Sequence, residues 1–116
     1  GATRRVLILG EMLELDGLSE SLHREIGEAV AASVNAGAGP DRVFLVGKGA
    51  WAAAEPIRRA LGDAAVGLEP GVGDGRSLAD GLVAGDAVLL KGSRGVGLER
   101  VIDALRSRSP SAGSRA

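Results

Sequence analysis

The chain contains four short apolar runs that are separated by more polar stretches. Continuous apolar runs of this length are typical of strands that are buried on both faces of a parallel sheet. The predicted strands cover residues 5–9, 42–46, 64–68 and 86–90, of which 64–68 is the weakest. Glycine follows the first two runs directly, so their loops are expected to begin there.

Between and after these runs, apolar side chains recur every three or four residues, which predicts helices. The predicted helices cover residues 19–35, 51–61, 76–83 and 98–106. In the first helix, the residues expected to face inward are Leu22, Ile26, Ala29, Val30 and Ser33. Pro56 is expected to kink the second helix or split it in two, and Ser77 is expected to cap the third.

Alternating strands and helices predict an α/β fold, a Rossmann-like three-layer domain with a mostly parallel sheet and helices on both faces. Ligands of such sheets bind beyond the carboxyl ends of the strands. The loops expected at that edge are 10–17, 47–50 and 92–97. No helix precedes the first strand, so one face of the sheet is expected to be incompletely covered.

Composition narrows the function classes. A length of 116 residues predicts one domain, which we expect to cover residues 1–106. The Ser- and Arg-rich stretch 107–116 is expected to be a disordered tail. A net charge of −1 does not favour a nucleic-acid partner. The absence of cysteine excludes disulfides and thiolate metal sites, and no metal site is predicted. No apolar run approaches the roughly 20 residues of a membrane span, so the expected location is cytoplasmic.

The most informative segment runs from Lys91 to Glu99, with the sequence KGSRGVGLE. It lies between a predicted strand and a predicted helix. Its glycines allow close backbone approach, and Lys91 and Arg94 add two cations beside a helix N-terminus. A carboxylate- or phosphate-binding loop is one interpretation, and a pair of solvated surface charges is the other.

The loop at residues 10–17 is unusually apolar for a connection. We expect its apolar residues to anchor the loop and Glu11 to point toward the site. The loop lacks the GxGxxG pattern of dinucleotide-binding folds, and the chain has no GxxxxGK[ST] phosphate loop. For His23, the single histidine, a structural hydrogen bond to the neighbouring loop is favoured over catalysis.

Three segments together resemble one family of enzymes. They are LGEMLEL at residues 9–15, LHREIG at 22–27 and LLKGSRGVGLE at 89–99. In this order and spacing they are similar to the C-terminal domain of the Mur ligases that add D-alanyl-D-alanine. The resemblance covers about residues 5–105, nearly the whole chain.

The resemblance implies a three-domain ligase that joins UDP-N-acetylmuramoyl-tripeptide to D-alanyl-D-alanine during peptidoglycan precursor synthesis. Such a ligase uses ATP and Mg²⁺ and forms an acyl phosphate. Its N-terminal domain holds the UDP-sugar, its central domain holds ATP, and its C-terminal domain brings in the amine. This chain would be the C-terminal domain without that domain's first strand and helix. It is expected to bind no cofactor alone and to be inactive without the two missing domains.

By position, the resemblance assigns Lys91, Ser93 and Arg94 to the side of the incoming dipeptide. Glu11 and Met12 would lie in the neighbouring loop and complete the substrate-binding set. No catalytic residue is assigned.

The resemblance and the loop composition also mark residues with a structural or loop-orienting role. These are His23, Gly10, Gly92 and Gly95. The family role of His23 stays unspecified.

Two alternatives remain open. The chain could be a free-standing binding or subunit module of the Mur ligase type that acts with a separate ATP-binding partner. A weaker alternative is a generic Rossmann-like nucleotide binder.

Overall fold

A computed structural model describes residues 3–12, 19–93 and 96–108 of the chain. Its four-stranded sheet is formed by β1 (Arg5–Gly10), β2 (Arg42–Val46), β3 (Val66–Glu69) and β4 (Ala87–Lys91). The strand order is β3-β2-β1-β4, and each neighbouring pair is parallel. The predicted α/β fold with a parallel sheet is therefore confirmed.

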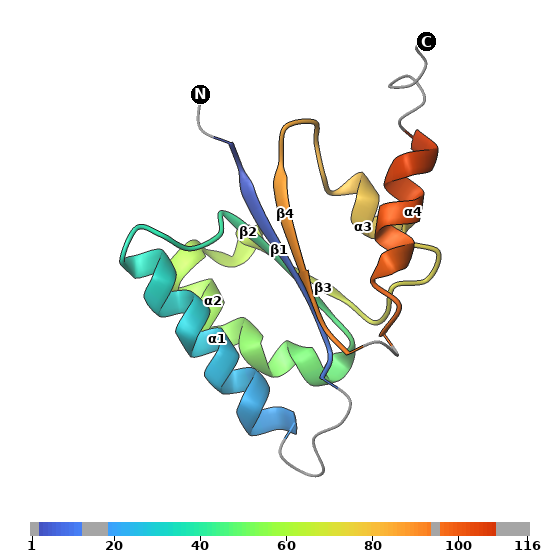
Figure 1. Cartoon of the computed structure of the whole chain (residues 1–116). Helices are drawn as coiled ribbons and strands as arrows, with labels where there is room; N and C mark the ends of the chain where they lie inside the picture. The colour runs from blue at the N-terminus through green and yellow to red at the C-terminus, as the bar shows by residue number, and fades with distance from the viewer. Residues whose placement is uncertain (1–2, 13–18, 94–95, 109–116) are drawn as a thin grey trace.

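Helices cover both faces of the sheet (Figure 1). One face carries α1 (Ser19–Asn35) and α2 (Ala54–Leu61), and the other carries α3 (Arg76–Asp80) and α4 (Glu99–Arg108). Side chains alternate between the faces along each strand. In β1, Leu7 and Leu9 belong to the apolar core under α1 and α2, whereas Val6 and Ile8 belong to the core under α3 and α4.

Helix α1 has the predicted bounds, but its inward face differs from the prediction. Ala29 and Ser33 are exposed, and His23 and Gly27 are buried instead. A Cβ on Gly27 would lie 2.6 Å from the carbonyl oxygen of Ala53. Helix α1 therefore packs closely against Ala53 at Gly27. This contact turns Ala29 and Ser33, which were predicted to face inward, away from the core.

The predicted second helix is split in two, which was one of the two outcomes expected from Pro56. A 3₁₀ helix, η1, spans Lys48–Ala53, and α2 follows directly at Ala54. Pro56 is the third residue of α2. Backbone N–H groups in the first turn of a helix have no partner within that helix, so a proline is tolerated there.

Helix α3 is shorter than predicted, and the prediction that Ser77 caps it is wrong. The N-cap position is held by Gly75 with a φ of 86°, without a side-chain cap. The Ser77 hydroxyl instead lies 3.4 Å from the carboxylate oxygens of Glu69. The helix ends before Gly81, where a Cβ would lie 2.5 Å from Cζ of Phe44.

Two other boundaries shift. A short 3₁₀ helix, η2 (Asp63–Ala65), takes the start of the predicted third strand, so β3 begins at Val66. Helix α4 extends to Arg108, two residues into the predicted tail. Residues 109–116 lie outside the described part of the chain.

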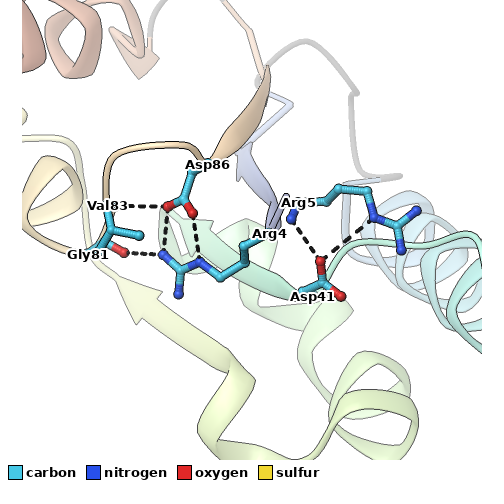
Figure 2. A network of polar contacts seen from close by, with 6 residues as sticks. All are labelled: Arg4, Arg5, Asp41, Gly81, Val83 and Asp86. Carbon is cyan, nitrogen blue, oxygen red and sulfur yellow. Dashed lines mark hydrogen bonds and ion pairs between the residues drawn. The ribbon is translucent and has the colours of Figure 1, made fainter. Parts of the chain in front are cut away.

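Two Arg–Asp pairs hold the amino ends of the central strands (Figure 2). Arg4 donates to both carboxylate oxygens of Asp86, at 3.0 and 2.7 Å, and to the carbonyl oxygen of Gly81. Next to it, the backbone N–H of Arg5 donates to Asp41 at 2.8 Å. Each aspartate lies just before a strand that flanks β1, so the pairs hold β1 between β2 and β4.

One sheet face is incompletely covered, as the sequence analysis predicted. Strand β4 is an edge strand, and the Leu89 side chain is 58% exposed. Its register partner Leu7, on the same face, is only 8% exposed because it lies in the core under α1 and α2. On this face the helices therefore cover β1 but leave β4 exposed.

Candidate functional site

Backbone hydrogen bonds join the loops at the carboxyl edge of the sheet. The N–H of Glu11, after β1, donates to the carbonyl of Val46 at 3.0 Å, and the N–H of Ser93, after β4, donates to the carbonyl of Glu11 at 3.3 Å. The N–H of Gly47 donates to the carbonyl of Glu69 at 2.8 Å. One network therefore links the carboxyl ends of all four strands.

The loops after β1 and β4 meet at two glycines. A Cβ on Gly92 would lie 3.0 Å from Cα of Gly10, and a Cβ on Gly10 would lie 3.0 Å from Cγ1 of Val96. Side chains at either position would push the loops apart. Gly95, the third glycine marked in the sequence, lies outside the described residues.

The Glu11 side chain lies against the loop that follows β2. A Cβ on Gly47 would approach Oε1 of Glu11 to 2.7 Å, and a Cβ on Gly49 would overlap the same carboxylate. Glu11 is half-buried. The carboxylate thus occupies the space left by two glycines at the start of η1, and it borders the loop cluster from that side.

Met12 is held by the single histidine. The backbone N–H of Met12 donates to Nε2 of His23 at 3.0 Å, and His23 is 0% exposed. Because Nε2 accepts this bond, the neutral imidazole carries its hydrogen on Nδ1. The Met12 side chain packs against the core under α1 and α2. His23 thereby connects α1 to the loop after β1 and acts here as an orienting residue.

The side chains of Lys91 and Ser93, both predicted to contact substrate, lie in different surroundings. Lys91 is exposed and lines a groove between β4 and α1, on the face that also holds its register partner Leu9. Ser93 is half-buried beside Glu11. Arg94 lies outside the described residues. Glu11, Met12 and Ser93 are therefore brought together, and Lys91 borders them from the groove.

Arg100 is a neighbour of this edge that the sequence pattern did not single out. Its guanidinium donates to the carbonyl oxygen of Gly73 at 3.2 Å and lies close to Gly97. It therefore connects the loop before α3 to the loop before α4. No local sequence signal marks this role, because Arg100 and Gly73 are 27 positions apart.

The side chains with shifted pKa values lie away from this edge. The hydrogen bond from Arg4 is the largest influence lowering the pKa of the Asp86 carboxyl, and the same bond raises the pKa of Arg4. Burial lowers the pKa of Arg42, whose guanidinium lies 4.4 Å from the Phe44 ring centre. These arginines and the aspartate hold the amino end of the sheet, so their shifts reflect structural contacts.

Two searches of the described residues returned nothing. In residues 3–12, 19–93 and 96–108, no group of three or more His, Cys, Asp or Glu side chains could hold a metal ion. In the same residues, no helix is both long and apolar enough to cross a membrane.

Comparisons with known proteins point to one enzyme class. The chain is 31% identical over 103 residues to the UDP-N-acetylmuramoyl-tripeptide–D-alanyl-D-alanine ligase of Bacillus subtilis, covering 88% of the chain and 21% of that ligase. The MurF ligase of Thermotoga maritima, solved in complex with ADP, has a similar fold with a TM-score of 0.61. That match covers 96% of the chain and 23% of the ligase, at 23% identity. No family model matches the chain.

The predicted resemblance to a D-alanyl-D-alanine-adding Mur ligase is therefore confirmed. The chain spans about a fifth of the length of the curated relative it matches. The structural neighbour shows the same fold over nearly all of the chain.

Proposed function

We propose that this chain, which resembles part of a D-alanyl-D-alanine-adding Mur ligase, serves as the C-terminal, substrate-side domain of such an enzyme. The full enzyme would join D-alanyl-D-alanine to UDP-N-acetylmuramoyl-tripeptide in peptidoglycan precursor synthesis. It would use ATP and Mg²⁺. The ADP bound to the Thermotoga ligase supports the use of ATP.

The observation that carries this proposal is the joined pair of loops at the carboxyl edge. Residues 10–12 and 91–93 belong to two of the three segments that resemble the ligase family, and Glu11 and Ser93 are 82 positions apart in sequence. The hydrogen bond from Ser93 to Glu11 brings them together. A family signature that converges at the ligand edge of a parallel sheet supports a binding role for both segments.

The domain would extend from residue 1 through Arg108, the last residue of α4. The UDP-sugar and ATP domains would be supplied by the same chain or by a partner chain. Because the sequence contains no GxxxxGK[ST] phosphate loop, the ATP chemistry would reside in those missing domains.

In this proposal the domain positions the incoming dipeptide and performs no proton transfer of its own. Arg94 would bind the dipeptide carboxylate through paired N–H donors, since a guanidinium matches a carboxylate in shape. Ser93 would add a polar contact beside Glu11, and Lys91 would add a positive charge from the bordering groove. Glu11 and Met12 would form the opposite wall. Holding the amine in position lowers the entropy cost of its attack on the acyl phosphate.

The test measures phosphate release from ATP with D-alanyl-D-alanine and UDP-N-acetylmuramoyl-tripeptide. Residues 1–116 alone should show no turnover, and the native longer protein should be active. In the longer protein, Arg94→Ala should lower kcat/KM for the dipeptide about tenfold or more, because a charge-assisted hydrogen bond is lost. Arg76→Ala is the matched control, since Arg76 is the first residue of α3 and its side chain is 83% exposed.

Turnover by residues 1–116 alone would refute the proposal, and equal effects of Arg94→Ala and Arg76→Ala would refute the assignment of the site. Tight binding of ATP or NAD by the isolated chain, unaffected by Arg94→Ala, would favour the generic nucleotide binder. Native protein that is recovered as this chain bound to a separate ATP-binding chain would favour the free-standing module.

A further inference from the structure

The carboxylate of Glu11 has no polar partner within residues 3–12, 19–93 and 96–108. The backbone of the same residue is engaged on both sides, because its N–H donates to Val46 and its carbonyl accepts from Ser93. The side chain makes no hydrogen bond and no ion pair with any described residue. It is half-buried, so it has lost part of its hydration. A partly desolvated carboxylate without donors is unfavourable until a donor arrives.

Two glycines fix the place of this carboxylate. A Cβ on Gly47 would lie 2.7 Å from Oε1 of Glu11, and a Cβ on Gly49 would overlap Oε2. Gly47 has a φ of 95°, which itself favours glycine, whereas Gly49 has no such backbone requirement. The missing side chain at position 49 therefore leaves room for the carboxylate of Glu11.

A hollow of about 350 Å³ opens beside Gly49. Its lining residues are Lys48, Gly49 and Ala52 of η1 and Glu20 in the first turn of α1. This volume lies at the lower end of the roughly 300–1,000 Å³ that small-molecule sites have. Because Glu11 lies against Gly49, the hollow adjoins the unpartnered carboxylate.

The charges around the hollow favour a cation. Glu11 and Glu20 bring two negative charges, and Lys48 brings one positive charge. No ion pair joins Lys48 to either carboxylate in the part of the chain that the structure describes. The remaining negative charge attracts an ammonium group and repels a second carboxylate.

We propose that Glu11 binds the ammonium group of the incoming dipeptide and thereby selects acceptors that carry a free primary amine. This inference rests on the proposed function, in which the domain positions D-alanyl-D-alanine, and it assigns one group of that substrate to one side chain. The dipeptide is a zwitterion, and its carboxylate end belongs on the side of the loop after β4. A charge-assisted hydrogen bond from the ammonium replaces the hydration that Glu11 has lost.

The contact is compatible with formation of the amide bond. The amine attacks in its neutral form, after one proton has passed to water, and its two remaining N–H groups can still donate to Glu11. As the C–N bond forms, the nitrogen becomes positively charged, and a carboxylate beside it stabilises that charge. The acyl carbon then releases phosphate, and the nitrogen gives a second proton to water. Glu11 therefore orients the nitrogen before and during its attack.

The test compares two ligands that differ only at the amine. D-Alanyl-D-alanine carries the ammonium group, and propionyl-D-alanine carries a hydrogen atom in its place. Their dissociation constants are measured by calorimetry on the native longer protein, with UDP-N-acetylmuramoyl-tripeptide and a non-hydrolysable ATP analogue present. In the unsubstituted protein the dipeptide should bind at least about tenfold more tightly, as expected for a charge-assisted hydrogen bond.

Substitutions of Glu11 should change the ratio of the two dissociation constants. Glu11→Gln should reduce the preference for the dipeptide to about threefold or less, because the charge is lost. Glu11→Asp keeps the charge on a shorter side chain and should restore part of the preference. Glu25→Gln is the matched control, since Glu25 is exposed on α1 and does not line the hollow. A merely structural role of Glu11 would weaken both ligands equally and leave the ratio unchanged.

Position 49 provides an independent variant. Gly49→Ala places a methyl group where the Glu11 carboxylate lies, so it should lower the preference as Glu11→Gln does. Gly71→Ala is the control, because a Cβ at Gly71 would meet open space. Its ratio should equal that of the unsubstituted protein.

Two results would overturn the assignment of Glu11. One is equal binding of the two ligands by the unsubstituted protein, and the other is a preference that Glu11→Gln leaves intact. Ligase turnover is measured separately. Turnover with equal binding of the two ligands contradicts this inference alone. A preference that Glu11→Gln abolishes, in a protein without turnover, contradicts the proposed function alone.

Discussion

Asp86 shows how one buried charge organises the amino edge of the sheet. Its side chain is only 3% exposed, and it accepts hydrogen bonds from Arg4 and from the N–H of Val83. These bonds favour the ionised carboxyl and lower its pKa from the ordinary value of 3.8. A carboxyl whose pKa is lowered by folding stabilises the folded state above its unfolded pKa, and this contribution is lost as pH falls through the folded pKa.

Replacement of Asp86 by Asn should therefore have a pH-dependent effect. At pH 7, Asp86→Asn should lower the free energy of unfolding, because the charged partner of Arg4 is lost. The difference from the unsubstituted chain should shrink as pH falls below 3.8, because the unfolded carboxyl takes up a proton there and the folded carboxyl follows at its lower pKa. Urea unfolding from about pH 5 downward measures this. Asp74→Asn, whose side chain is 72% exposed, is the control, and a difference that is constant with pH would contradict the prediction.

At the scale of elements, the connection between β1 and α1 depends on a contact rather than on helix or strand propensity. The His23 ring is buried under the loop and holds the N–H of Met12. The sequence indicated such a bond because a lone histidine has no catalytic partner nearby. It could not identify Met12 as the partner, because that depends on how α1 packs against the end of β1, 11 positions away in the sequence.

Loss of this contact should loosen the loop before it affects the sheet. His23→Ala leaves the Met12 N–H without its acceptor and creates a cavity, which should cost about 2 kcal/mol or more. Hydrogen exchange at the Met12 amide should become faster. Arg24→Ala, at the next and exposed position of α1, should change stability by less than about 0.5 kcal/mol. Unchanged exchange at Met12 in His23→Ala would argue against the orienting role.

The packing of α3 on α4 requires glycine at position 75, because of its backbone conformation and because of its close contact with α4. Gly75 has a φ of +86°, and a Cβ there would lie 2.3 Å from the carbonyl oxygen of Arg100. Gly73 has a φ of +59° with open space around it, and Gly71 has open space without a positive φ. Gly71 and Gly73 therefore serve as controls for Gly75, since Gly71 has neither feature and Gly73 has only the positive φ.

Alanine at these three glycines should separate the two effects. Gly71→Ala should change stability by less than about 0.5 kcal/mol. Gly73→Ala should cost about 1 kcal/mol from the left-handed backbone alone. Gly75→Ala should cost more than about 2 kcal/mol, because the overlap with α4 adds to the backbone strain. Denaturant unfolding measures the series, and equal costs at positions 73 and 75 would show that α3 shifts freely on α4.

For the whole molecule, the sheet order decides what the predicted elements can do together. Strand β1 lies at the centre and β4 at the edge beside it. This order brings the loop at 10–12 against the loop at 92–93, which makes the candidate site. The same order leaves Leu89 uncovered. The candidate ligand edge and the open groove are therefore two consequences of one arrangement.

The sequence alone determined the alternation of strands and helices, the parallel α/β class, a kink or split in the second predicted helix, and the two glycine-bearing loops that carry the family resemblance. These are local properties, because periodicity, proline and glycine act within a few residues. Only the tertiary structure decided the strand order, the rotation of α1 toward Gly27, the contact between Ser93 and Glu11, and the direction of Lys91 into the groove. Those features depend on crossover handedness and on close packing between distant segments, which no local pattern encodes.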